Sequence, residues 1–370
     1  MRASFFQLFE DCTKLGMKIP KEDYLDNGLY PIIDQGQSAI AGYCNNDAGI
    51  FSDVPVIAFG DHTCAVKYVD RPFFLGAYGV KLLRCKRDDA DVKYLYYALS
   101  AVRIPNAGYS RHYKWLKYLS FSLPPVKKQG HIAAVLDRIT GLISERNRQL
   151  EQLDLMVKSQ FIELFGDPVK NPKGWDAPCI EDAVANSRNA LKAGPFGYSL
   201  KKEFYVESGY KIYGQEQVIR GDAHYGDYYI DEEKFRSLQS CEVLANDVLI
   251  SLVGTYGKVL IIPEDFEPGI INPRLIKITF NPEKVNTTFF RYFFESDSVV
   301  CSLSENTRGL TMDFLNLGII KKIRLPLPPL PLQNRFAEFA RQADKSKLEI
   351  RQGLNGLKLQ YNALMQKYFG

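Results

Sequence analysis

The sequence lacks the patterns that would place the chain in a membrane, a secreted disulfide scaffold or a zinc module. No run of about 18 apolar residues occurs, so no transmembrane helix is expected. The first residues also lack the sustained apolar core of a signal peptide. The seven cysteines are scattered and never form a C-x-x-C pair, which argues against disulfides and zinc. These absences predict a soluble, cytoplasmic protein.

Motifs of catalysis are absent as well. The segment Gly254-Thr-Tyr-Gly-Lys258 has too few residues before its Gly-Lys pair to be a P-loop. No G-x-G-x-x-G, H-E-x-x-H or G-x-S-x-G occurs, nor does the Asn/Asp-Pro-Pro-aromatic motif of adenine methyltransferases. Metal-ligand spacing is missing among the four histidines, which are His62, His112, His131 and His224. The sequence therefore predicts no catalytic residues, no metal site and no cofactor in this chain.

Length and charge set broad limits. The 370 residues exceed one ordinary domain, so two or three units are expected. The net charge of +4 is only mildly basic, so any charge that binds nucleic acid has to be local. Aromatic residues make up 13% of the chain and can serve either a core or a recognition surface.

An internal repeat is the main feature that the sequence does contain. Segments 121–166 and 325–370 align without a gap, with Pro124 matching Pro328 at an offset of 204 residues. In each copy a Leu-Pro-Pro element precedes a long pattern with seven-residue recurrence, and a Gly stands where the helix should end. The repeat predicts two long helices paired as an antiparallel coiled coil. The alternative is that each is an ordinary amphipathic helix packed on its own domain.

The apolar stripe of each predicted helix consists of two rows. In the first helix they are Ile132, Ile139, Arg146, Leu153, Gln160 and Leu136, Ile143, Leu150, Val157, Leu164. In the second they are Phe336, Ala343, Ile350, Leu357, Leu364 and Ala340, Lys347, Leu354, Tyr361, Tyr368.

The segments before the helices also correspond, more weakly, and both are rich in short β patterns. The matched pairs are 9–11 with 180–182, 30–37 with 210–217, and 53–60 with 247–254. The predicted fold class is α+β, with two β-rich globular domains separated by two long antiparallel coiled-coil helices in a pseudo-two-fold repeat. The predicted boundaries are 1–120 and 167–324 for the globular domains, and 121–166 and 325–370 for the helical segments.

Several of these motifs resemble a known family. The run Leu-Pro-Pro-x-x-x-Gln-x-x-Ile/Phe-Ala, followed by a long helix ending in Phe-Gly, is similar to the conserved regions of type I restriction–modification specificity subunits. Segment 161–175 resembles the family's junction into its second target-recognition domain, and 30–43 resembles the opening of such domains. The resemblance covers essentially the whole chain. One departure is that the first domain is shorter and lacks the Pro-Lys-Gly-Trp signature at its start.

The resemblance implies a non-catalytic subunit that reads a two-part target in double-stranded DNA. It implies that the helices set the spacer of that target and dock two methyltransferase subunits, which use S-adenosylmethionine, and that restriction subunits join them. S-adenosylmethionine, ATP and magnesium are then expected in the partner subunits alone. Two alternatives stay open: a nuclease or methyltransferase fragment with an unrecognised active site, and a coiled-coil adaptor that does not touch DNA.

Candidate DNA contacts are the residue types that span the major groove or bind phosphate. A basic run interleaved with aromatics precedes the first Leu-Pro-Pro, and it contains Tyr109, Ser110, Arg111, His112, Tyr113 and Lys114. Its counterpart before the second contains Asn306, Arg308 and Thr311. Turns after apolar strands offer His62, Tyr256 and Lys258, and amides suited to adenine are Gln35, Gln37, Gln215 and Gln217. The plainer alternatives are solvated loops, hairpin turns and structural amides.

Overall fold

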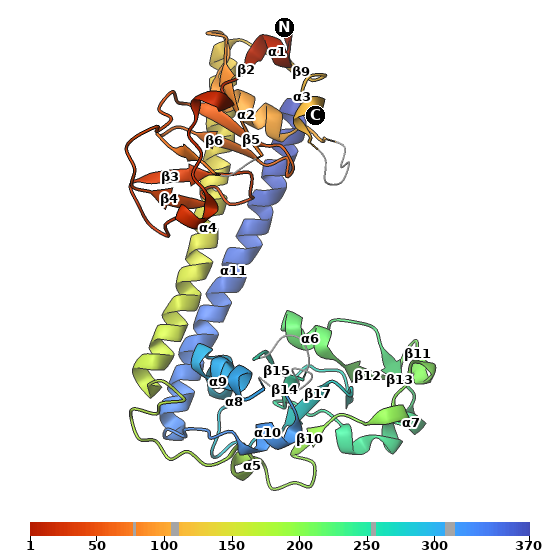
Figure 1. The fold of residues 1–370 in the computed structure, drawn as a ribbon. Coiled ribbons are helices and arrows are strands. Elements are labelled where there is room, and N and C mark those ends of the chain that lie inside the picture. The colour runs from red at the N-terminus through yellow and green to blue at the C-terminus, as the bar shows by residue number, and fades with distance from the viewer. Residues whose placement is uncertain (77–78, 105–110, 253–256, 308–314) are drawn as a thin grey trace. The chain divides into compact units, whose positions relative to one another are not determined.

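The computed structural model describes residues 1–76, 79–104, 111–252, 257–307 and 315–370. The chain forms two compact units (Figure 1). Unit 1 consists of Met1–Arg148 with Arg351–Gly370, and unit 2 consists of Gln149–Ile350. Within the described ranges, no helix combines the length and the apolar character needed to cross a membrane.

Unit 1 is built on small β-sheets. Its strands are β1 (Arg2–Ser4), β2 (Phe9–Asp11), β3 (Tyr30–Ile33), β4 (Gly42–Cys44), β5 (Val56–Gly60), β6 (Val66–Val69), β7 (Phe74–Leu75), β8 (Val80–Cys85) and β9 (Ser120–Ser122). One sheet has the antiparallel order β2–β8–β5–β6, and the other has the order β4–β3–β7, in which β3 and β7 run parallel. Strand β1 pairs with β9. Its short helices are α1 (Phe5–Leu8), α2 (Val92–Ser100) and α3 (Tyr113–Leu116), with 3-10 turns at Thr13–Leu15 and Lys21–Asp23.

Unit 2 repeats this plan with additional elements. Its strands are β10 (Leu191–Ala193), β11 (Tyr205–Val206), β12 (Tyr210–Tyr213), β13 (Tyr229–Ile230), β14 (Val248–Ser251), β15 (Val259–Ile261), β16 (Gly269–Ile271) and β17 (Leu275–Ile278). The sheets have the orders β10–β17–β14–β15 and β11–β13–β12–β16, and β12 and β16 run parallel. Its short helices are α5 (Ile180–Ala183), α6 (Gln215–Arg220), α7 (Glu232–Ser237), α8 (Thr287–Phe294), α9 (Asp297–Thr307) and α10 (Leu317–Lys322). The 3-10 turns are Gly197–Ser199, Lys202–Phe204 and Gln239–Cys241.

The two units share strand order and direction, as the repeat predicts. Strand β3 and strand β12 both begin at the tyrosine of the matched segments, and each has a parallel neighbour, β7 or β16. Strands β5 and β14 lie at the same place in the two antiparallel sheets. The observed architecture confirms the predicted α+β class with two β-rich regions.

One predicted correspondence is wrong. The sequence match paired 9–11 with 180–182, but the structure places the first segment in strand β2 and the second in helix α5. The counterpart of α5 is α1, because Phe5 N donates to Leu119 O and Ile180 N donates to Ile323 O, both at 3.0 Å. Residues 9–11 and 180–182 match in sequence because both contain a Glu-Asp pair. Helices α1 and α5 have no identical residue at corresponding positions, so sequence identity does not reveal that they correspond.

A long helix follows each β-rich region along the chain. Helix α4 (Val126–Phe165) and helix α11 (Leu330–Phe369) begin and end at the same offset of 204 residues. In unit 1 the start of α4 shares a core with the end of α11, and in unit 2 the end of α4 shares a core with the start of α11. The helices therefore run antiparallel, side by side within each unit (Figure 1). Gly166 ends α4 with a φ of +79°, a conformation suited to glycine.

The predicted stripe is the contact surface of the two helices. All its members are buried or half-buried except Arg146, which is exposed. In unit 2, Phe161 and Phe336 pack with ring centroids 5.4 Å apart. Lys347, a charged member of the stripe, is buried and forms an ion pair with Asp154 of α4 at 2.6 Å. Each helix end also packs on the sheet region of its own unit. The two long helices therefore contact both each other and the β-rich regions.

Candidate nucleic-acid interface

Three of the predicted contact segments meet in unit 1, next to the end of strand β5. The amide oxygen Oε1 of Gln35 accepts a hydrogen bond from His62 N at 3.3 Å. The hydroxyl of Thr63 donates to the backbone carbonyl of Gln35. A side chain at Gly79 would collide with the Gln35 amide, so this glycine, with a φ of +97°, permits the close approach.

Asp61 fastens the third segment to this turn. Its carboxylate, which is buried, accepts from Tyr113 N at 2.8 Å, and its carbonyl accepts from His112 N at 2.8 Å. The His112 ring is also buried, and its Nδ1 lies 3.0 Å from the Asp61 carbonyl, so this histidine has a structural role. The neighbours Arg111 and Lys114 are exposed on either side. Unit 1 therefore presents two exposed cations on a backbone that a buried carboxylate holds in place.

Charge pairs support the surrounding turns of unit 1. Lys67, which is buried, lies 3.2 Å from Asp34, the residue before Gln35. Lys81 forms an ion pair with Asp11 at 2.7 Å and lies 5.0 Å from the centroid of the Tyr113 ring. Burial alone would raise the pKa of Asp11, but the hydrogen bonds from Lys81 and Thr13 lower it below its ordinary value. Asp11 thus stays ionised at neutral pH and keeps Lys81 in position.

Unit 2 brings a related set together where β14 ends and α6 begins. The Gln215 amide donates from Nε2 to Ser251 Oγ at 2.8 Å and accepts at Oε1 from Arg274 Nη1 at 3.3 Å. Arg274 is exposed, and its backbone N donates to Asn272 Oδ1 at 2.9 Å. Gln215 follows β12 as Gln35 follows β3, so the two amides occupy corresponding places in the two units.

Lys258 and Gln217 complete the described part of the unit 2 site, and they differ in exposure. Lys258 is exposed and precedes Val259, whose backbone N donates to the Glu295 carboxylate at 3.1 Å. Burial raises the pKa of Glu295. Gln217 is buried; its Oε1 accepts from Gly214 N at 2.9 Å and its Nε2 donates to Tyr225 O at 2.8 Å. This geometry favours the structural alternative for Gln217.

The remaining predicted contacts divide into one exposed residue and several outside the described part of the chain. Gln37 is exposed, two residues beyond Gln35. The backbone of Tyr109, Ser110, Tyr256, Arg308 and Thr311, and the side chain of Asn306, lie outside what the structure describes.

Sequence reasoning missed Arg274, Asp61 and Ser251. Arg274 follows an Asn-Pro turn between two apolar strands, a pattern that could have indicated an exposed tip. Asp61 and Ser251 carry no such pattern, because their roles depend on partners far away in sequence.

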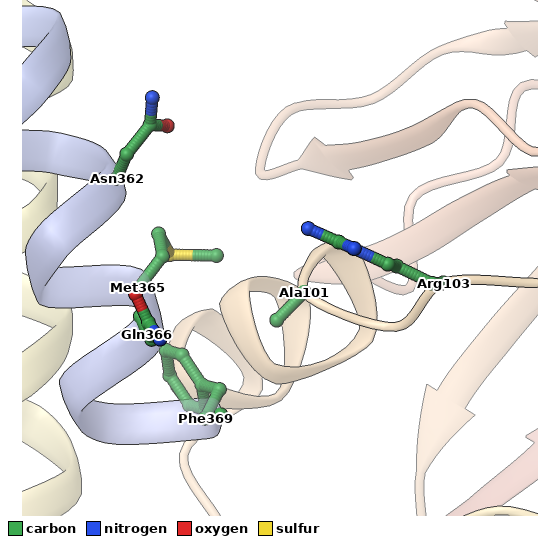
Figure 2. Close-up of a pocket in the computed structure, with 7 residues that line it drawn as sticks. Ala101, Arg103, Asn362, Met365, Gln366 and Phe369 are labelled. Atoms are coloured by element: carbon green, nitrogen blue, oxygen red, sulfur yellow. The ribbon is translucent and has the colours of Figure 1, made fainter.

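No group of three or more His, Cys, Asp or Glu in the described ranges could hold a metal ion. A pocket of about 700 Å³ in unit 1 lies between the end of α2 and the last turns of α11 (Figure 2). It is lined by Ala101, Arg103, Asn362, Met365, Gln366, Phe369 and Gly370. No lining side chain is a carboxylate, thiol or imidazole, so the pocket contains no side-chain acid–base pair.

Comparison with known proteins gives consistent relatives. A protein-family model described as the type I restriction modification DNA specificity domain matches residues 196–357. The Escherichia coli type I restriction enzyme EcoR124I/EcoR124II specificity subunit is 31% identical over 94% of this chain and 86% of that protein. The Methanocaldococcus jannaschii type I restriction enzyme MjaVIII specificity subunit is 23% identical over 62% of this chain, and the chain spans 56% of the length of that relative.

Solved structures share the fold. The S subunit of a type I restriction–modification system from M. genitalium has a TM-score of 0.64 at 17% identity, covering 100% of this chain and 96% of that chain. A chain from a structure of the assembly and conformational transition of the type I R-M system has a TM-score of 0.56 at 14% identity, covering 100% and 97%. These identities establish the fold alone, whereas the Escherichia coli relative establishes the family. The chain belongs to the specificity subunits of type I restriction–modification systems.

Proposed function

We propose that this chain reads a two-part target in double-stranded DNA, one part with each β-rich region. The observation that carries the proposal is the recurrence of one polar arrangement. In both units a glutamine follows the strand that has a parallel neighbour, β3 or β12, and forms a hydrogen bond at or just beyond the end of β5 or β14, and exposed cations accompany it in both units. Arginine, lysine and glutamine are the side chains that contact bases and phosphates.

We assign recognition to residues 1–120 and 167–324, and spacing to the helical segments 121–166 and 325–370. The proposed contacts are the exposed members of the predicted set, which are Arg111, Lys114, Gln37 and Lys258, together with Arg274. Gln35 and Gln215 are proposed to contact DNA from half-buried positions. His62 stands beside Gln35 and completes the set in unit 1.

The proposed partners are two methyltransferase subunits and restriction subunits, as in type I systems. The chain is the non-catalytic specificity subunit of such an enzyme. S-adenosylmethionine, ATP and magnesium are therefore proposed to act in the partners. We also propose a cytoplasmic location, since all seven cysteines are free thiols, which suits a reducing compartment.

Methylome sequencing tests the function. The chain and its methyltransferase subunits are expressed in a host without other adenine methylation, and methylated positions are mapped by long-read sequencing. We expect one motif made of two short parts separated by a spacer of fixed length, because two separate regions read it. The methyltransferase subunits expressed without this chain serve as the control and should leave the motif unmodified. A continuous motif would contradict the proposal.

A further inference from the structure

A buried glutamine occupies the same place near the start of each long helix. Gln129 of α4 and Gln333 of α11 are both 0% exposed. The Gln129 amide accepts from Asp91 N at 2.9 Å and donates to Asp89 O at 3.0 Å and Pro124 O at 2.7 Å. Three bonds of nearly the same lengths recur in unit 2.

In unit 2 the Gln333 amide accepts from Asn286 N at 2.9 Å and donates to Lys284 O at 3.0 Å and Pro328 O at 2.8 Å. The agreement between the two units extends to every donor and acceptor of the amide. The helices differ elsewhere on the same face; for example, Leu136 of α4 corresponds to Ala340 of α11. The amide is therefore a more constant feature of the two copies than the apolar packing around it.

Each amide joins three separate stretches of its unit. These are the long helix itself, the Leu-Pro-Pro segment that leads into it, and the loop between the central sheet and helix α2 or α8. That loop continues directly from β8 in unit 1 and follows β17 in unit 2. Each glutamine side chain thus ties its long helix to the segment before the helix and to the loop that follows the sheet.

Capping of the short helices does not account for these amides. Helix α2 is capped by Asp91, whose side chain accepts from Tyr94 N, and α8 by Asn286, which accepts from Thr288 N and Phe289 N. The glutamines bond instead to the backbone N of these capping residues, one step outside the helices. A buried amide with all its partners satisfied fixes one geometry, whereas apolar contact tolerates small rotations.

We infer that Gln129 and Gln333 are positioning residues that set the angle between each recognition region and its long helix, and thereby the spacer length the subunit accepts. The inference rests on the proposed function. One base pair changes the separation of two DNA sites by about 3.4 Å and rotates them by about a tenth of a turn. Discrimination at that level requires a junction that does not bend, and these amides supply it.

The test uses purified complexes of the chain with its methyltransferase subunits and compares their activity on DNA with different spacer lengths. Methylation rates are measured on duplexes that carry the mapped half-sites with the native spacer, one base pair fewer and one more. In Gln129→Met and Gln333→Met, which keep the volume and remove the bonds, we expect the rate on altered spacers relative to the native spacer to rise about tenfold. The milder variants Gln129→Asn and Gln333→Asn should shift the ratio in the same direction if the Met variants do not assemble.

Matched controls separate positioning from stability. Leu82→Ala in β8 and Leu249→Ala in β14 remove fully buried side chains from core clusters that contain no residue of α4 or α11. They should lower the melting temperature and leave the spacer ratio unchanged. An unchanged ratio in all four glutamine variants, with a two-part motif in the wild type, overturns the inference. Absence of a two-part motif in the wild type overturns the proposed function instead.

Discussion

At the residue scale, unit 2 contains a buried ammonium group that is paired with a carboxylate. Lys211 of β12 is 1% exposed, and its Nζ lies 2.5 Å from Glu267 Oε1 and 2.9 Å from His224 O. Tyr229 donates to the other oxygen of Glu267 at 3.1 Å. The hydrogen bond from Lys211 lowers the pKa of Glu267, against the opposing effect of burial. The ion pair therefore contributes stability above the ordinary carboxyl pKa and loses it as the pH falls through the lowered value.

This pair predicts a pH-dependent effect of Glu267→Gln. At neutral pH the variant should lose about 1–3 kcal/mol of unfolding free energy, because the buried ammonium loses its counter-charge. The loss stays in this range because solvent already screens the partly exposed carboxylate of Glu267. As the pH falls and Glu267 is protonated in the wild type, the two proteins should converge. Thermal unfolding from about pH 7 to pH 3 measures this. Glu203→Gln, in an exposed pair with Lys201, serves as the control and should match the wild type throughout.

A second prediction at the residue scale concerns the effect of Arg274 on DNA binding. Gln215 orients its guanidinium, and no acidic partner for it is found among the described residues. If it contacts a base, Arg274→Ala should weaken DNA binding by the assembled complex about tenfold and relax one position in one half of the motif. Fluorescence anisotropy at fixed salt and methylome sequencing measure the two effects.

The matched control for Arg274 is Arg236→Ala on helix α7. Arg236 is exposed like Arg274, but it is paired with Glu232 along its own helix. It should leave both affinity and motif unchanged. A uniform loss of affinity in Arg274→Ala without a change of motif would indicate a phosphate contact. No change in either quantity would remove Arg274 from the interface.

At the element scale, the long helices were predictable from sequence because their signal is periodic and repeated. The two helix starts and the two helix ends are each separated by the same offset of 204 residues. Strands β3 and β12 lie in matched segments for the same reason, and each begins at the matched tyrosine. Local sequence patterns predict an element correctly where the interactions that form the element are also local.

Elements with non-local causes were not predictable from the sequence. Helices α1 and α5 correspond through backbone bonds to residues more than a hundred positions away, so no shared letters reveal them. The buried amide of Gln217 and the buried ring of His112 could not be told from exposed ones, because their partners lie in other turns. The sequence thus indicated candidate loops, and tertiary contacts decide which of their side chains face outward.

At the scale of the whole molecule, each unit is assembled from separated stretches of chain. Residues Arg351–Gly370 belong to unit 1, although more than two hundred residues of unit 2 lie between them and the rest of it. Five side chains of this segment pack on the unit 1 core, namely Tyr361, Leu364, Met365, Tyr368 and Phe369. Tyr94 and Phe369 lie with ring centroids 5.2 Å apart. The last turns of α11 are thus part of unit 1.

Removal of residues 351–370 should therefore destabilise unit 1 selectively. Loss of five partly buried apolar side chains costs on the order of 5 kcal/mol, so hydrogen exchange should quicken in unit 1 peptides and change little in β14 or β17. Leu364→Ala, which packs on the unit 1 core, should produce a smaller effect of the same kind. Leu359→Ala, on the same helix but 71% exposed, should not. Equal acceleration in both units would contradict this division of the chain.

The placement of residues 351–370 in unit 1 also constrains the order of events during synthesis. The ribosome makes the sheets of unit 1 before those of unit 2, yet residues that cover part of the unit 1 core are made only after all of unit 2. Unit 2 has all its segments once residue 350 has emerged. Until then, part of the apolar core in the first half of the nascent chain stays uncovered. A chain that terminates early would keep this apolar surface exposed, where chaperones and proteases can bind it.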